Sequence, residues 1–180
     1  MDRYTIIKML CAYQPTQEEI VFKEKIIDFL SNNEDCFKRS LEIGHVTASA
    51  WVLNKNKEKA LLMHHAKLNL WVQLGGHCDG NPDVLSVAIK EAQEESGIQH
   101  ITLVNKEIFD IDIHHIPANR YEMAHYHYDI RFLVQVMSDE QGIRNHESRA
   151  LKWIGKNYAE LPTNQRSVVR MFEKWVNNFS

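Results

Sequence analysis

The chain has 180 residues, 44% of them hydrophobic and 25% charged, which is ordinary for one globular domain with a substantial core. The formal net charge of −3 offers no basic surface for a nucleic-acid polymer, and no apolar run approaches the roughly 18 residues of a membrane helix. Charged side chains at positions 2, 3 and 8 lead us to expect no secretory signal in residues 1–14. We therefore expect neither a nucleic-acid polymer nor a membrane as a partner.

The cysteines indicate the cellular compartment, and the histidines are unusually numerous. Three cysteines, Cys11, Cys36 and Cys78, are odd in number and widely spaced, so they predict neither a disulfide framework nor a CxxC metal site. This usage favours a reducing compartment, and we expect a cytoplasmic protein. Ten histidines are unusual for this length, and several of them are grouped along the chain.

Both ends of the chain have helical patterns. Thr16 to Glu19 have the form of a capping box, and apolar residues at helical spacing follow it, so we expect a helical segment over residues 1–40. Near the other end, a segment opened by Pro162 and Thr163 places four apolar residues on one face: Val168, Phe172, Trp175 and Phe179. We expect both segments to be helices that pack on a core.

Between these ends the pattern predicts strands and one central helix. The expected strands cover residues 45–53, 59–64, 71–74, 101–116, 122–137 and 150–154. The polar residues 54–58 form the expected hairpin loop between the first two. This order predicts an α+β fold with helices on both sides of a sheet.

The central helix follows a glycine-rich segment. Three glycines in residues 75–83 predict a tight loop that allows a ligand to approach the backbone closely. Asn81 is the expected N-cap, Pro82 suits the first helical position, and Asp83 suits the positive end of the helix dipole. We expect the helix over residues 84–96, with Gly97 as the residue that ends it.

Three carboxylates share one face of this helix. Glu91, Glu94 and Glu95 stand at i, i+3 and i+4, an unfavourable grouping that Lys90 offsets only in part. Hard divalent cations prefer such oxygen clusters, and Mg²⁺ commonly bridges carboxylates to substrate phosphates. An acidic triplet alone indicates a solvated helix face, but the glycine loop before it and Gly97 after it favour a metal site.

Residues 76–98 resemble the signature of the Nudix hydrolases, G-x5-E-x7-R-E-U-x-E-E-x-G-U, where U is a bulky aliphatic residue. The chain has Gly76 and Pro82 at the first two fixed positions, and residues 90–98 read Lys-Glu-Ala-Gln-Glu-Glu-Ser-Gly-Ile without a gap. Pro82, Lys90 and Ala92 depart from the pattern. In the family the early Glu and the Arg brace the loop. We expect Asn81 and Pro82 to fix the helix start instead, and Asp79 or Asp83 to pair with Lys90.

The resemblance implies a Nudix fold, an α/β/α sandwich with a central mixed sheet, as a single domain over residues 1–180. The helical extension of residues 1–40 would pack on it. The resemblance also implies that Mg²⁺ or Mn²⁺ is held by Glu91, Glu94, Glu95 and the carbonyl of Gly75. Glu94, Glu95 or Glu147 would serve as the catalytic base. Related proteins often dimerise, so a homodimer is a further expectation.

The histidines form two patterns. In residues 125–132 the side chains alternate, so His125, His127 and Asp129 share one strand face, which is either solvated or lines the substrate cleft. Imidazole and carboxylate at i and i+2 can bind metal or meet phosphate. A second set, Asp110, Asp112 and His114, would meet this face if the two segments form a hairpin around residues 117–121, which suggests a second metal site. His77, directly after the glycine pair, is expected beside the substrate.

The leading function is a divalent-metal-dependent hydrolase that cleaves a diphosphate linkage in a nucleoside diphosphate-linked or related small molecule. One alternative is an isopentenyl-diphosphate-isomerase-like enzyme, because such enzymes have a Cys-Gly-His segment where this chain has Gly75, Gly76 and His77. The other is a catalytically degenerate nucleotide-binding sensor domain, which Pro82 and Lys90 motivate. Aromatic residues could stack on a base, although aromatics are more often core: Trp71, Tyr121 and Trp153. His45, His64 and His65 are further residues near the expected cleft.

Overall fold

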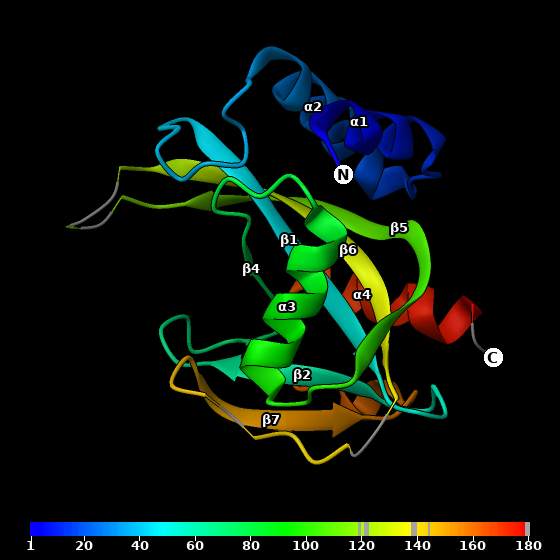
Figure 1. Ribbon diagram of the computed structural model, residues 1–180. Coiled ribbons are helices and arrows are strands. Elements are labelled where there is room, and N and C mark those ends of the chain that lie inside the picture. The colour runs from blue at the N-terminus through cyan, green and yellow to red at the C-terminus, as the bar shows by residue number, and fades with distance from the viewer. Residues whose placement is uncertain (119, 121–122, 138–139, 144, 179–180) are drawn as a thin grey trace.

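The computed structural model describes residues 1–118, 120, 123–137, 140–143 and 145–178 (Figure 1). Its helices are α1 (Arg3–Ala12), α2 (Ile20–Asn32), α3 (Val84–Ser96) and α4 (Arg166–Asn178), with 3-10 turns at Gln17–Glu19 and Tyr158–Glu160. Its strands are β1 (Gly44–Leu53), β2 (Ala60–His65), β3 (Trp71–Val72), β4 (Leu74–His77), β5 (Ile101–Ile116), β6 (His125–Val136) and β7 (Ser148–Ile154). The central helix and the strand over residues 101–116 are confirmed to the residue.

The strands form one mixed sheet in the order β3-β2-β1-β6-β5, with β4 added to β1 and β7 added to β2. Strand β1 lies at its centre. One edge of β1 pairs in parallel with β6 along its whole length, while the other edge pairs antiparallel with β4 and then with β2. The predicted hairpin between β1 and β2 and the predicted hairpin of β5 with β6 are both confirmed.

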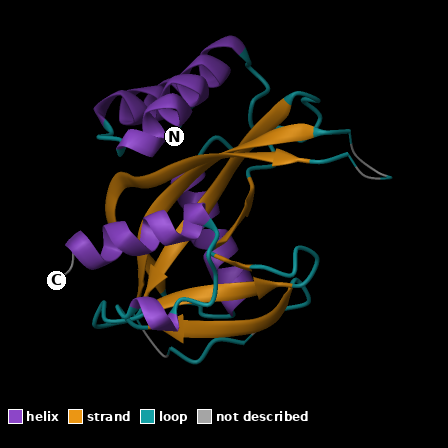
Figure 2. Ribbon diagram, turned by 180° about the vertical axis from the view of Figure 1, so that it is seen from behind, coloured by secondary structure: helices purple, strands orange, loops and turns teal. Residues whose placement is uncertain are grey.

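Helices cover both faces of the sheet, as expected. Helix α3 lies in front of it in Figure 1, and the reverse view of Figure 2 brings α4 to the front. Alternate residues of β1 supply the two cores: Val46 and Ala48 pack on the side of α1, α2 and α3, whereas Trp51 and Leu53 pack on the side of α4. The α/β/α arrangement with a central mixed sheet is therefore confirmed. No described helix has the length and apolar character that crossing a lipid bilayer demands.

The N-terminal helices pack on the α3 side of the sheet through buried Ile6, Leu10, Ile26 and Leu30. The predicted capping box is present, since the Thr16 N–H donates to Glu19 Oε2 at 2.8 Å. The expectation of helix as far as residue 40 is wrong, because α2 ends at Asn32 and the chain then forms turns that lead into β1. Phe179, expected on the face of α4, lies outside the described residues.

The glycine-rich segment differs from expectation in two places. It begins as strand β4 rather than as a loop, because Thr47 pairs with His77 and Ser49 pairs with Gly75. The N-cap of α3 is Asp83, whose side chain accepts from the Ser86 N–H, and not Asn81. The side chain of Asn81 is already engaged, since its Oδ1 accepts from the Asp83 N–H at 2.9 Å. Gly97 ends the helix in the left-handed conformation, as predicted.

Candidate active site

The three glutamates of the Nudix-like segment lie at graded depths along α3. Buried Val84, Val87, Ala88 and Ala92 hold the helix against the sheet. Glu95 is only 3% exposed, whereas the side chain of Glu91 is 19% exposed and that of Glu94 is 57% exposed. The cluster therefore runs from the protein interior to solvent, which suits a ligand that enters from outside.

Glu95 is the buried end of this cluster. Its Oε2 accepts a hydrogen bond of 2.8 Å from the Gly75 N–H of β4. Burial, together with the negative charges of Glu91 and Glu147, raises the pKa of Glu95 to about 8 against the opposing effect of the Gly75 hydrogen bond. Without a cation nearby, the carboxylate therefore holds its proton near neutral pH.

Glu91 and Glu94 lie beside Lys90. The Lys90 Nζ is 3.2 Å from Glu91 Oε1 and 3.0 Å from Glu94 Oε2, so the predicted pairing of Lys90 with Asp79 or Asp83 is wrong. Burial still raises the pKa of Glu91 despite this partner. A Cβ at Gly76 would contact the Glu91 carboxylate, so glycine lets β4 pass α3 without displacing that side chain.

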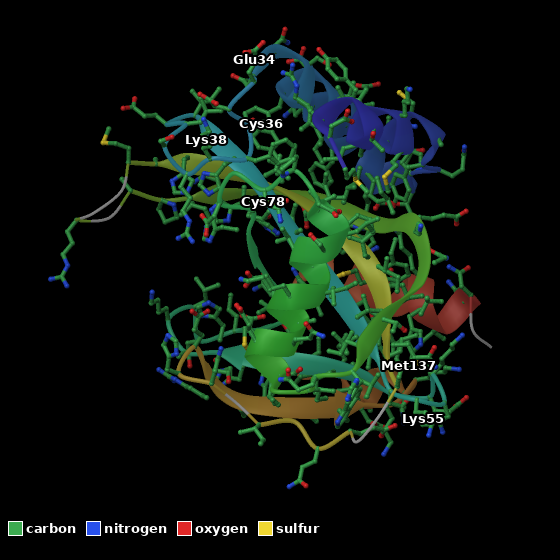
Figure 3. All side chains as sticks on the ribbon, viewed as in Figure 1. Glu34, Cys36, Lys38, Lys55, Cys78 and Met137 are labelled. Atoms are coloured by element: carbon green, nitrogen blue, oxygen red, sulfur yellow. The ribbon has the colours of Figure 1, made fainter. Side chains whose placement is uncertain are left out.

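A segment before β1 braces the loop that precedes α3. Arg39 Nη2 lies 2.7 Å from Asp79 Oδ2, and the Phe37 carbonyl accepts from the Gly80 N–H at 2.8 Å. Cys36 and Cys78 lie on these two facing segments (Figure 3). The sequence patterns missed this brace, because Arg39 falls in a stretch expected to be helical and is far from the loop along the chain.

Glu147 lies in the segment between β6 and β7. Its charge raises the pKa of both Glu91 and Glu95, so its side chain lies near α3, and that side chain is 50% exposed. The Ile143 N–H donates to the Ser96 carbonyl at 2.7 Å, which ties this segment to the end of α3. The position is consistent with the predicted catalytic role, which stays a prediction.

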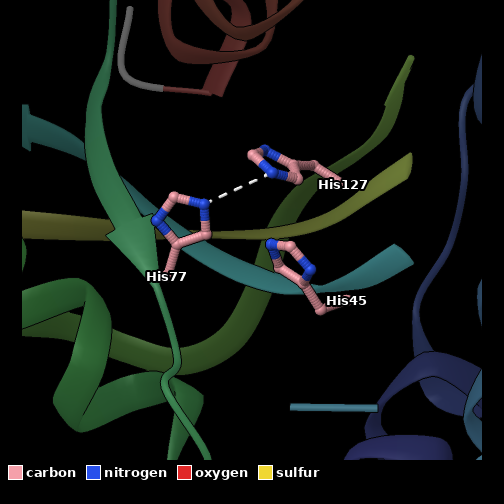
Figure 4. Close-up of side chains that lie close together, drawn as sticks. All are labelled: His45, His77 and His127. Atoms are coloured by element: carbon pink, nitrogen blue, oxygen red, sulfur yellow. Dashed lines mark hydrogen bonds between the residues drawn. The ribbon is translucent and has the colours of Figure 1, made fainter. Parts of the chain in front are cut away.

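Histidines gather on the opposite face of β4. His77 Nε2 is 3.3 Å from His127 Nε2, which in turn is 3.2 Å from His125 Nε2 (Figure 4). The ring centroid of His45 lies 4.8 Å from that of His127. Burial, together with the neighbouring imidazoles, lowers the pKa of His127 to about 3, so its ring is neutral. The structure thus brings together three predicted substrate-binding residues, with His45 in addition.

Asp129 lies deeper than expected. It is 2% exposed, and its carboxylate accepts from Thr47 at 2.9 Å, from Ser49 at 2.8 Å and from Arg131 Nε at 2.6 Å. Burial would raise its pKa, but the charge of Arg131 outweighs burial and lowers it. These contacts make Asp129 a support beneath the histidines rather than a residue open to substrate.

The predicted second metal site around Asp110, Asp112 and His114 is wrong. The polar faces of β5 and β6 do meet, but the cation between them is Arg131, which is 3.0 Å from Asp110 and 3.3 Å from Asp112. Its Nη2 also lies 2.8 Å from His114 Nε2. Arg170 adds a second guanidinium 2.8 Å from Asp110. The sequence patterns paired these strands correctly but overlooked the two arginines as counter-ions.

The remaining expected residues have ordinary contacts. His64 stacks on Trp71 with ring centroids 5.1 Å apart, and Trp153 Nε1 donates to the Glu140 carbonyl at 3.1 Å. His65 Nδ1 accepts from the Lys67 N–H at 3.2 Å. Tyr121 lies outside the described residues. The three cysteines are free, as expected.

Comparison with known proteins identifies the family. The model of the NUDIX domain matches residues 44–175, so the chain belongs to the Nudix family. A Nudix-family hydrolase from Clostridium perfringens is similar at 26% identity and a TM-score of 0.56, over 76% of this chain and 98% of that chain. An Ap4A hydrolase of C. elegans is similar at 19% identity and a TM-score of 0.55, over 74% and 98%. The protein is therefore a Nudix hydrolase of the pyrophosphohydrolase type, as the motif led us to expect.

A third structure extends the likeness to the N-terminal helices. A UDP-X diphosphatase, at 14% identity and a TM-score of 0.55, is matched over 99% of this chain and 93% of that chain. At this identity the likeness concerns the fold alone. It indicates that α1 and α2, which precede the residues matched by the NUDIX model, belong to an arrangement found in another protein of this fold.

Proposed function

We propose that this Nudix hydrolase depends on Mg²⁺ or Mn²⁺ and cleaves the diphosphate linkage of a nucleoside diphosphate-linked or related small molecule. The observation that carries the proposal is Glu95, a buried carboxylate with a pKa raised to about 8 beside Glu91 and Glu147. Such a group is stabilised as an anion by a cation placed among its neighbours. The residues present therefore fit a divalent ion.

Glu91, Glu94, Glu95 and the Gly75 carbonyl are the proposed ligands. A divalent ion bound there would neutralise charge on the diphosphate and lower the pKa of an attacking water. The Gly75 N–H fixes Glu95 through its hydrogen bond, and Lys90 keeps Glu91 and Glu94 together before substrate arrives.

The protein's own residues supply the proton acceptor and the diphosphate contacts. We propose Glu94, Glu95 or Glu147 as the group that takes the proton from water, and Glu94 and Glu147 are both open to solvent there. His77, His125 and His127 are the proposed contacts of the substrate, and Asp129 orients the strand beneath them through its hydrogen bonds to Thr47 and Ser49.

The isomerase alternative is disfavoured by Gly75. A side chain there would lie 2.6 Å from Ser49 Cα, so β4 has no room for the cysteine that such enzymes place at this position. Cys78, on the other side of His77, does not replace it, because burial raises the pKa of its thiol.

A substrate screen tests the proposal. Ap4A and UDP-linked compounds are the first candidates, because two of the similar structures are named for such compounds, followed by nucleoside triphosphates and coenzymes. We expect phosphate-bond cleavage of at least one compound with Mg²⁺ or Mn²⁺ and none with a chelator. Binding without turnover across the panel would contradict hydrolysis and favour the sensor alternative, and isomerised isopentenyl diphosphate would favour the isomerase.

Two further proposals concern the cellular location and the oligomeric state of the enzyme. Three free cysteines support a reducing compartment, so we propose a cytoplasmic location, which fractionation of the native cells measures. A homodimer stays a prediction from the family resemblance, and sedimentation of the purified chain measures it.

A further inference from the structure

The sheet register brings three histidines to one place independently of their rotamers. His45 of β1 is the direct partner of His127 on the parallel strand β6. His77 of β4 pairs with Thr47, which follows His45 by two residues and so shares its face of the sheet. Neighbouring strands lie about 4.8 Å apart, so these three side chains leave the same face within reach of one another.

The nitrogen atoms of these rings converge. One ligand atom from each of His45, His77 and His127 lies within 4.8 Å of the other two. Four nitrogens bound tetrahedrally to zinc at about 2.0–2.1 Å are about 3.3 Å apart, which matches the 3.3 Å between His77 Nε2 and His127 Nε2. The three rings border one common space in Figure 4.

A bound cation accounts for the converging ring nitrogens better than hydrogen bonds between the rings do. His125 Nδ1 is 2.8 Å from the Met123 carbonyl and must donate to it, which leaves its Nε2 as an acceptor facing His127. His127 Nε2 faces both His125 Nε2 and His77 Nε2, and in a neutral imidazole it carries either one hydrogen or one lone pair. A cation, in contrast, accepts lone pairs from several rings at once.

We propose that His45, His77 and His127 form a binding site for a transition-metal ion of the Zn²⁺ class, separate from the carboxylate site on α3. Imidazole nitrogens suit zinc, whereas Mg²⁺ prefers the oxygens of Glu91 and Glu95. Three histidines leave the fourth position of a tetrahedral ion open, as in catalytic zinc sites. His77 and His127 are only partly buried, which gives the ion a path of entry.

The two sites lie on opposite sides of β4. The Cα of Gly76 faces Glu91 of α3, and the adjacent His77 points the other way, toward the face of Thr47 and Ser49. A water molecule or a phosphate oxygen is the kind of ligand that the open fourth position would take.

Calorimetric titration with Zn²⁺ alone tests this site. The chelator-stripped protein, carrying Cys11→Ser to remove the exposed thiol, should bind one equivalent of Zn²⁺ per chain. His77→Ala and His127→Ala should each weaken binding at least about 100-fold, since even a lost second-shell partner costs roughly 10–100-fold. Co²⁺ in place of Zn²⁺ should give the visible absorption of a tetrahedral nitrogen site.

Two matched variants keep the test independent of hydrolysis. His100→Ala removes an exposed histidine outside the cluster, and Glu95→Gln disables the carboxylate site, and both should bind Zn²⁺ as the parent protein does. Thermal melts of the metal-free proteins show that each variant is folded. The proposal is overturned if the parent protein binds no Zn²⁺ more tightly than His77→Ala, or if Glu95→Gln abolishes the binding.

Discussion

Two acidic clusters in this enzyme use similar residues and differ in their counter-ions. On α3, burial raises the pKa of Glu91 and Glu95, and exposed Lys90 pairs with Glu91 and Glu94 at the solvent end of the cluster. Between β5, β6 and α4, Asp110 is just as buried, yet Arg131 and Arg170 lie against it and lower its pKa to about 2.

The difference shows how to separate a metal site from a structural charge network. Both clusters look alike as sequence, because each has carboxylates at spacings that place them on one face. In the structure, guanidinium groups already neutralise Asp110 and its neighbours, which leaves no need for a metal. The buried carboxylate of Glu95 has no such partner of its own in the contacts described, and a divalent ion fits there.

The largest expected effect comes from removing a charge on α3. Glu95→Gln should lower turnover of the best substrate at least about 1000-fold, equivalent to about 4 kcal/mol, because the metal-bound state loses its buried anionic ligand. Steady-state kinetics with Mg²⁺ measure the loss. Glu24→Gln, on an exposed face of α2, is the matched control and should be as active as the parent. Full activity of Glu95→Gln would contradict the claim that the α3 cluster is a metal site and the Asp110 cluster a structural charge network.

The second effect should be on stability rather than chemistry. Arg131→Met leaves Asp110, Asp112 and Asp129 buried without their shared partner and should lower the free energy of unfolding by about 3–5 kcal/mol. Denaturant unfolding measures it. Arg149→Met, which loses one exposed contact to Asn69, should cost less than about 1 kcal/mol. Equal losses in the two variants would contradict the network.

The lowered pKa of Asp110 should make the free energy of unfolding depend on pH in the acidic range. Burial alone would raise its pKa, but the hydrogen bond from Arg170 and the charges of Arg131 and Lys174 lower it to about 2, against 3.8 in the unfolded chain. Its stabilisation is therefore complete above pH 3.8 and is lost as the pH falls toward 2, a change of about 2 kcal/mol. Unfolding of the parent and Asp110→Asn across this range measures it, and parallel curves would refute the assignment.

The smallest effect should come from the brace of the Nudix loop. Arg39 and Asp79 are each about half exposed, so Arg39→Ala should lower the free energy of unfolding by less than about 1 kcal/mol. Because the pair positions the loop before α3, the same variant should raise the Mg²⁺ concentration needed for half-maximal turnover several-fold. Lys38→Ala, which removes a neighbouring exposed pair with Asp35, is the control and should leave that concentration unchanged.

Much of the fold was predictable because it follows local rules. The capping box at Thr16, the left-handed Gly97 and the alternation of β5 and β6 each act within a few residues, and the structure confirms them. The N-cap of α3 was misplaced by two residues, because Asn81 and Asp83 are both good caps and only the loop geometry decides between them.

The candidate site was predictable only in its contiguous part. The glutamates of α3 follow from spacing along one helix, whereas the cluster of His45 with His77 and His127 depends on strands that are distant in sequence. Arg131 follows Asp129 by two residues and so shares its strand face, but nothing local indicated that the Asp110 and Asp112 carboxylates would surround it. Long-range register, which pattern analysis does not supply, decides these contacts.

The most direct test is the binding of Mn²⁺ to the metal-free protein, followed by the electron paramagnetic resonance signal of the free ion. The tightest Mn²⁺ site should be present in the parent protein and in His77→Ala and lost in Glu95→Gln, because oxygen ligands on α3 hold this ion. Unchanged Mn²⁺ binding in Glu95→Gln would contradict the assignment of the buried carboxylate cluster as the metal site of this Nudix hydrolase.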